Sequence, residues 1–164
     1  MLTSELTTKD AILSGMAGAA ALTAVHQAAR MMTDSAPRMD VVGMRAIARG
    51  KEAVAGGGDT QALATTDNPA LYNMALAGDL VFNSAYYSMA TTWTRGAALG
   101  ILAGVGALVL PRKLGLGEPP KSELLSNQIM TVAWYLVGGL AAAWTAQCLA
   151  EKRAEQTREF VGGY

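Results

Sequence analysis

The sequence predicts an all-α integral membrane protein: a four-helix bundle, with a short interfacial amphipathic helix between spans one and two. The first observation is that four segments of this 164-residue chain contain no Asp, Glu, Lys or Arg: 11–29, 80–94, 96–111 and 124–150. A membrane-spanning helix needs about 17–25 mostly apolar residues, and a charge at bilayer depth is costly. The second observation is the abundance of alanine and of glycine, with 18 glycines. Small residues allow membrane helices to pack closely.

The overall composition narrows the classes of protein to consider. The hydrophobic fraction is 51%, and the mean hydropathy of +0.23 is modest because much of that fraction is alanine. The alternative, a soluble alanine-rich bundle, would normally carry charge on its outer face every three or four residues. Thirteen basic and thirteen acidic residues cancel, so no global charge indicates a nucleic-acid partner. Cys148 is the only cysteine, which excludes an intrachain disulfide.

The first span is expected at about 10–31. Thr7 and Asp10 have the spacing of a capping box, in which a hydroxyl and a carboxylate satisfy early backbone donors. The apolar run after Lys9 also has features of a signal peptide, but we expect it to be retained as a span. A polar loop, 33–68, follows. Within it, the spacing of charged and apolar residues over 37–54 predicts the amphipathic helix.

The second span is expected at 69–90, because Asn68 and Pro69 are typical of a helix start. The third span, at 95–111, is closed by Pro111, and the fourth occupies 124–149. The remaining residues, 151–164, carry charges of both signs and are expected to form a solvated tail.

The distribution of Lys and Arg predicts the orientation. With four spans, the two termini and the connection near Trp93 lie on one side, together with five basic residues, while the other side has eight. This difference favours both termini outside the cell. We therefore expect an integral protein of a bacterial-type inner membrane whose partner is the lipid bilayer.

Glycines repeat at every fourth position in the third span. Gly96, Gly100 and Gly104 share one helical face, and Gly138 with Gly139 gives the fourth span a similar face. Such faces let another backbone approach closely. The sequence predicts a tight helix contact within the chain, with a homo-oligomer contact as the alternative.

Polar residues within the predicted spans form the candidate functional cluster. Asp79 lies about ten residues into the second span, which is roughly 15 Å along the helix axis and near mid-bilayer. An intramembrane carboxylate is by default a functional candidate. A contact with His26, the only histidine, would create a proton relay. The predicted polar cluster comprises His26, Arg30, Asn73, Asp79 and Asn83. A structural hydrogen-bond cluster that clamps the helices together is the alternative interpretation.

Several other side chains have positional interpretations. Arg30 and Asp34 have the i,i+4 spacing of an ion pair. Trp134 and Tyr135 lie deep in the fourth span, where core packing is favoured over cavity lining. A basic cluster would attract anionic lipid headgroups, with topology determination as the plainer interpretation. It comprises Arg38, Arg45, Arg49 and Lys51.

Three classes of function compete. The first is a small channel or transporter that moves protons, ions or small polar solutes past Asp79, Asn83 and His26. The second is a non-catalytic scaffold or accessory subunit that packs through its glycine faces. The third is a haem-binding membrane protein that uses His26. No nucleophile motif, phosphate loop or metal-ligand spacing indicates an enzyme, a metal site or a resident cofactor.

Overall fold

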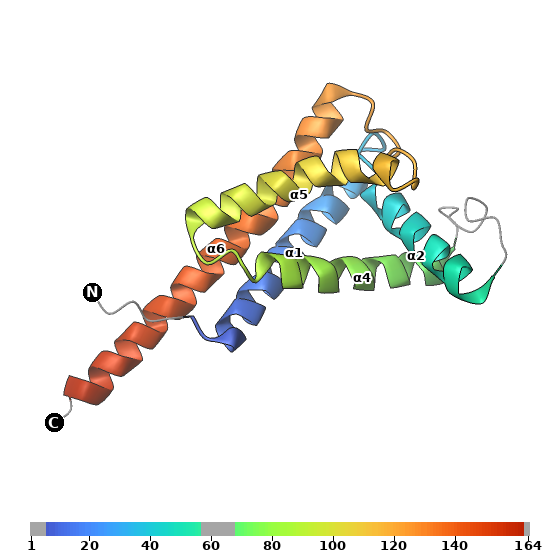
Figure 1. Cartoon of the computed structure of the whole chain (residues 1–164). Helices are drawn as coiled ribbons and strands as arrows, with labels where there is room; N and C mark the ends of the chain where they lie inside the picture. The colour runs from blue at the N-terminus through green and yellow to red at the C-terminus, as the bar shows by residue number, and fades with distance from the viewer. Residues whose placement is uncertain (1–5, 57–67, 163–164) are drawn as a thin grey trace.

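The computed structural model describes residues 6–56 and 68–162, and the predicted all-helical class is confirmed for them. These residues form five helices and no strand (Figure 1). The helices are α1 (Thr8–Met32), α2 (Met39–Ala55), α4 (Pro69–Tyr87), α5 (Trp93–Lys113) and α6 (Leu125–Gly162). Most of the predicted loop after Gly56 falls outside the described residues.

Local capping determines where two helices begin, as predicted. The Thr7 hydroxyl accepts from the Asp10 backbone N–H, and the Asp10 carboxylate accepts from the Thr7 backbone N–H, which completes the capping box of α1. The Asn68 side chain accepts from the Leu71 N–H, with Pro69 in the first turn of α4. In both cases a side chain satisfies a backbone donor that the first helical turn leaves free.

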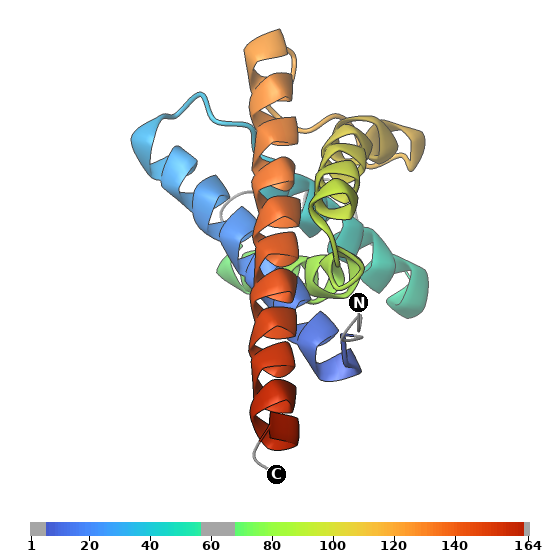
Figure 2. The same ribbon diagram turned by 90° about the vertical axis from the view of Figure 1, so that its left-hand side faces the viewer.

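The long helix α6 is the centre of the structure, and it extends beyond the other helices towards the C-terminus (Figure 2). It runs antiparallel to α1, because Arg153 pairs with Asp10 at one end while Asn127 donates to the Ser35 carbonyl at the other. The beginning of α1 and the end of α6 therefore lie at the same end of the molecule (Figure 1). The predicted solvated tail is a helical continuation of α6 as far as Gly162.

Adjacent glycines let α6 receive a helix on each of two faces. A Cβ on Gly138 would meet the Leu22 Cβ on α1 at 3.1 Å and the Tyr87 ring on α4 at 2.9 Å. A Cβ on Gly139 would instead collide with the Gly96 backbone of α5. Because neither glycine has a side chain, both neighbours approach the α6 backbone directly.

Three glycines of α5, Gly96, Gly100 and Gly104, face α6. A Cβ on Gly100 would lie 2.6 Å from the Leu136 Cα, and one on Gly104 would lie 2.7 Å from the Val132 Cα. One helical turn before Gly100, Gly96 contacts the Gly139 backbone of α6. The close contact of this glycine face is therefore made within the chain, against α6.

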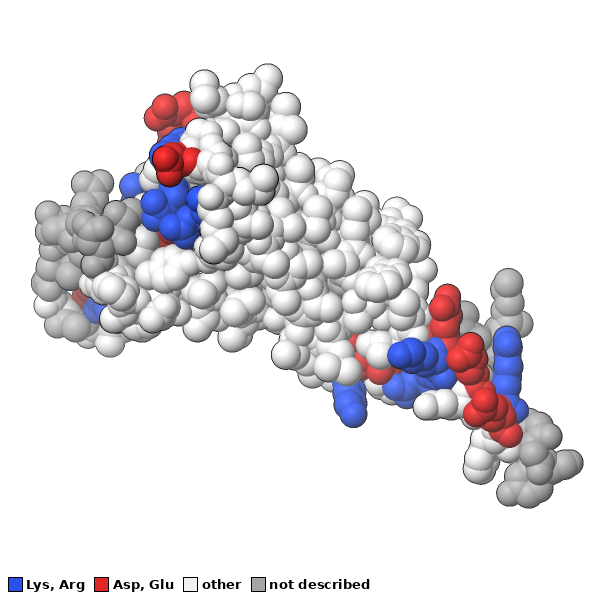
Figure 3. Space-filling view, turned by 180° about the vertical axis from the view of Figure 1, so that it is seen from behind, with Lys and Arg blue, Asp and Glu red and all other residues white. Residues whose placement is uncertain are grey.

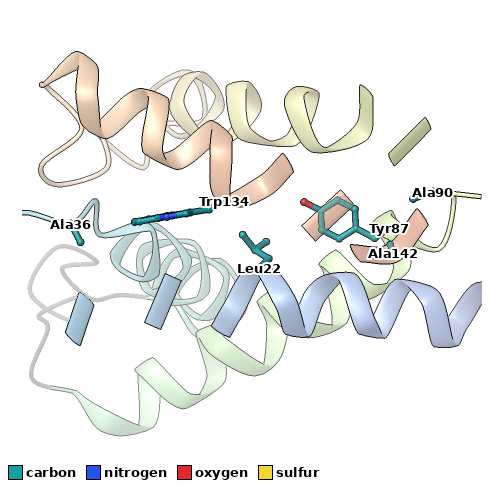
Figure 4. Close-up of a cluster of buried hydrophobic side chains, with 6 residues drawn as sticks. All are labelled: Leu22, Ala36, Tyr87, Ala90, Trp134 and Ala142. Atoms are coloured by element: carbon teal, nitrogen blue, oxygen red, sulfur yellow. The ribbon is translucent and has the colours of Figure 1, made fainter. Parts of the chain in front are cut away.

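Large side chains fill the space between α1, α4 and α6. Leu22, Tyr87 and Trp134 are all buried there, together with Ala142 (Figure 4). The Tyr87 hydroxyl donates to the Tyr135 carbonyl at 2.7 Å, so its one polar atom is satisfied. The core thus combines aromatic packing with backbone approach at small residues.

Helix α2 is confirmed as a helix and packs on α4. Its buried residues are Val41, Met44 and Ala48, which meet Leu71 and Ala75 of α4. Three further apolar residues of α2, Val42, Ala46 and Ile47, lie along a cavity. Helix α2 therefore has two apolar sides: one packs on α4, and the other lines the cavity.

Three described helices, α1, α5 and α6, are long and apolar enough to cross a membrane. Most of the apolar window in each helix is not buried inside the protein. On the face shown in Figure 3, charged side chains gather at two ends, and the surface between them is uncharged. These features suggest a membrane protein. The predicted four spans are not confirmed, because α4 is not among the candidates: Asn73, Asp79 and Asn83 lower its hydropathy.

The predicted end of the third span needs a correction. Pro111 was expected to close the helix, but α5 continues through it to Lys113. A proline removes one backbone donor, and near a helix end this loss affects only the last turn. The Leu114 N–H still bonds to the Leu110 carbonyl at 2.9 Å, which completes the final turn around the proline.

Candidate functional site

A cavity of about 400 Å³ lies between the helices, and all five contribute to its wall. Helix α4 packs on α1 and α2, whereas α5 packs on α6, and few direct contacts join α4 to α5. The cavity occupies the space that this arrangement leaves, with Ala107 and Pro111 of α5 on one side. Its wall is mostly apolar. The polar and titratable side chains in it are Thr23, His26, Gln27, Asp40, Tyr72, Asp79 and Tyr135.

Asp79 lies in the wall of this cavity on α4, and its side chain is exposed. The buried Asn83, one turn further along, donates from Nδ2 to the Asp79 Oδ1 at 2.8 Å. Within the described ranges, no Lys, Arg or His forms an ion pair with this carboxylate. This amide donor satisfies part of the hydrogen-bonding capacity of Asp79 but supplies no opposite charge.

His26 is held at the wall by two contacts. Its Nε2 lies 3.2 Å from the Pro37 carbonyl oxygen, and its ring stacks on Trp134 with 5.0 Å between centroids. A carbonyl oxygen only accepts, so Nε2 carries the proton and donates it. The predicted direct contact of His26 with Asp79 is wrong for the part of the chain that is described: the two residues line one cavity without a bond between them.

Asp40 is the polar residue that the predicted cluster missed. Arg38 donates to both of its oxygens, from Nε at 2.9 Å and from Nη2 at 2.8 Å, and the Nη1 of Arg30 lies 3.2 Å from Oδ2. The Asp40 side chain is only 10% exposed. Arg30 is thus paired with Asp40 rather than with Asp34, which the i,i+4 spacing suggested. A local clue existed, since Arg38 and Asp40 are two residues apart at the start of α2.

The charges around Asp40 determine its protonation. Burial raises the pKa of Asp40. The hydrogen bond from Arg38 and the charges of Arg30 and Arg38 lower this pKa by more than burial raises it, so the net shift is downward. The same hydrogen bond raises the pKa of Arg38. Asp40 is therefore an ionised carboxylate whose charge is balanced by Arg30 and Arg38. Asp79 has no such partner among the described residues.

Two further polar contacts link α1 to α4 beside this ion pair. The Gln27 side chain donates to the Tyr72 hydroxyl, and the guanidinium of Arg30 lies 5.8 Å from the centroid of the Tyr72 ring. Asn73, which the sequence placed in the polar cluster, is exposed and is not among the residues of the cavity wall. The preceding residue, Tyr72, lines the cavity instead of Asn73.

The basic cluster of the sequence binds partly within the chain. The Nη1 of Arg45 donates to the carbonyls of Leu116 and Glu118, at 3.1 and 3.0 Å, and the Nη1 of Arg49 donates to the Leu114 carbonyl at 2.6 Å. These bonds attach α2 to the segment after α5. The assignment of Arg38, Arg45, Arg49 and Lys51 to lipid headgroups stays a prediction, and Lys51 is exposed.

The arrangement of titratable groups limits the chemistry that the site can perform. Among residues 6–56 and 68–162, no three His, Cys, Asp or Glu side chains come together in a group that could hold a metal ion. Trp134 and Tyr135 both line the cavity, and Trp134 also belongs to the core. Comparison of the chain with protein-family models, with curated proteins and with solved structures gives no match.

Proposed function

We propose that this protein is a small membrane transporter or channel that moves protons or small polar solutes through the cavity. The observation that carries the proposal is Asp79, an exposed carboxylate with no cationic partner among the described residues, in a mostly apolar wall. A carboxylate in a low-dielectric region is costly unless it is paired, protonated or hydrated. The presence of the Asp79 carboxylate at a cavity therefore favours a role in binding or passing a charged or polar species.

The order of polar groups along the cavity supports the same proposal. Asp40 lies near the charged end, where Arg30 and Arg38 neutralise it, and it is close enough to His26 for their charges to interact. His26 and Asp79 line the same cavity. A polar species would therefore meet side chains that accept or donate hydrogen bonds at successive positions.

The test is proton flux into proteoliposomes under a potassium diffusion potential, followed with an internal pH-sensitive dye. We expect Asp79→Asn to reduce the flux at least tenfold and Asp79→Glu to keep most of it. Asn73→Ala is the matched control, because Asn73 lies on the same helix outside the cavity wall. Equal flux through the wild type and Asp79→Asn would remove Asp79 from the mechanism.

The two alternatives have less support. The scaffold proposal depends on glycine faces that are free for a partner, and Gly96, Gly100 and Gly104 contact α6 of the same chain. For haem binding, the Nε2 of His26 is engaged by a carbonyl oxygen and one ring face is covered by Trp134. A visible spectrum of the protein with added haem tests that alternative; absence of a Soret band eliminates it.

A further inference from the structure

We propose that the cavity binds a small organic cation with an apolar body, of the amine or quaternary ammonium class. This inference rests on the proposed function and names the class of its substrate. The wall contains two carboxylates, Asp40 and Asp79, and none of its described residues is Lys or Arg. Its formal charge is therefore negative, which complements a cation.

The two carboxylates are not equivalent, and the difference locates the cationic group. Asp40 receives two guanidinium groups, those of Arg30 and Arg38, so its charge is already balanced. Asp79 receives one amide N–H from Asn83. Because the surroundings of Asp79 are apolar, its attraction for a cation is less screened than in water. The cationic group of the ligand is placed at Asp79.

The rest of the wall fits an organic cation better than a metal ion. Metal cations such as Ca²⁺ need about six to eight oxygen ligands, and the described residues gather no group of three acidic, His or Cys side chains. Aromatic rings are abundant instead: Tyr72, Phe82, Trp134 and Tyr135 all line the cavity. Such rings bury apolar groups and attract cations through their π faces.

The size of the cavity suits this class of ligand. A volume of about 400 Å³ lies near the lower end of the roughly 300–1,000 Å³ that small-molecule sites occupy. Phe82 follows Asp79 by three positions, so both side chains lie on one side of α4. A ligand of one aromatic ring and one ammonium group can therefore reach both.

The experiment measures binding of benzyltrimethylammonium by isothermal titration calorimetry, using the full chain in phosphatidylcholine nanodiscs. Empty nanodiscs correct for partition of the probe into lipid. The quaternary ammonium has no titratable proton, so its charge is constant. We expect saturable binding to the wild type, at least tenfold weaker binding to Asp79→Asn, and no binding of the anion phenylmethanesulfonate. Glu123→Gln, which removes an exposed carboxylate outside the cavity wall, leaves the affinity unchanged.

A second variant keeps the carboxylate and removes space, so the test does not depend on one substitution. Gly78 lines the cavity, and a Cβ added there would meet nothing within 4 Å. Gly78→Leu is expected to weaken benzyltrimethylammonium binding at least fivefold, with a smaller loss for tetramethylammonium. Gly50→Leu is the matched control: Gly50 also has open space around it, and it does not line the cavity.

The outcomes separate this inference from the proposed function. Equal affinity in the wild type and Asp79→Asn, or an absence of binding to the wild type, overturns the organic-cation inference. Asp79-dependent proton flux without cation binding would leave the proposed function in place and reject the ligand class. Asp79-dependent cation binding without flux of protons or of the cation supports the ligand class and rejects transport.

Discussion

Gly96 and Gly139 lie backbone against backbone, so that a Cβ on either residue would collide with the carbonyl oxygen of the other. This pair joins α5 to the central helix α6, while the neighbouring Gly138 contacts α1 and α4 on another face of α6. Helix association in a membrane depends on such close packing, since lipid tails are as apolar as leucine side chains.

The close approach at Gly96 makes an alanine there unfavourable. Gly96→Ala is expected to lower the stability of the folded protein by about 1–3 kcal/mol, because the added methyl group overpacks against backbone atoms that cannot rotate away. The measurement is the midpoint of thermal unfolding in detergent, followed by circular dichroism.

Gly106→Ala is the control on the same helix. The nearest atom to a Cβ at Gly106 is the flexible end of Leu110 at 3.4 Å, an ordinary contact. Alanine is the better helix former, so this variant is expected to be as stable as the wild type or slightly more stable. Equal midpoints for the Gly96 and Gly106 variants would contradict the proposed importance of the Gly96–Gly139 contact.

The ion pairs of Asp40 connect α1 to the start of α2. Asp40→Asn is expected to destabilise the fold by about 1–3 kcal/mol, because two partly buried guanidinium groups lose their counter-charge. Chemical unfolding followed by tryptophan fluorescence measures the effect. Asp34→Asn is the control, because Asp34 is exposed and its side chain forms no ion pair with the residues that the structure describes. A difference below the error of the measurement between the two variants would show that the pairing contributes little.

The lowered pKa of Asp40 predicts a dependence of stability on pH. A carboxyl group whose pKa is depressed by folding adds stability above its unfolded pKa, about 3.9 for Asp. That contribution is lost as the pH falls through the lower pKa of the folded state. The difference in unfolding free energy between the wild type and Asp40→Asn should therefore be constant above about pH 5 and shrink below about pH 4. A difference that grows on acidification would contradict this sign.

Arg45 attaches α2 to the segment that follows α5. Removing its two hydrogen bonds with Arg45→Gln is expected to increase amide hydrogen exchange over residues 39–55 about tenfold, since bonds to charged groups contribute about 1.5–3 kcal/mol when buried and less when exposed. Lys51→Gln removes a charge from the same helix without these bonds and is the control. Similar exchange in both variants would indicate that α2 is held by its apolar contacts with α4 alone.

Features that depend on neighbouring residues were predicted well. The capping box of Thr7 and Asp10 and the start of α4 at Asn68 and Pro69 require only side chains within a few positions, so the sequence contains the whole interaction. The close approach along Gly96, Gly100 and Gly104 followed from their spacing. Its partner within the chain, α6, did not follow from it.

Features that depend on how the helices cross could not be read from spacing. The sequence suggested that His26 meets Asp79, but the orientation of α1 brings His26 to Trp134 and the Pro37 carbonyl. The same orientation brings Arg30 to Asp40 instead of Asp34. A few tens of degrees of helix rotation decide which side chains meet, and hydrophobic spacing constrains that rotation weakly when most of the face is alanine and glycine.

The sequence by itself determined that this chain is helical, that long stretches of it are free of charge, and that Asp79 directly precedes one of those stretches. Only the tertiary structure decided that Asp79 lies at a cavity with an amide partner and, within the described residues, no ion pair, while Asp40 is neutralised by two arginines. The physical reason is that hydropathy and capping act over a few residues along the chain. The compensation of a charge, in contrast, depends on which groups the packing of separate helices brings within a few ångströms.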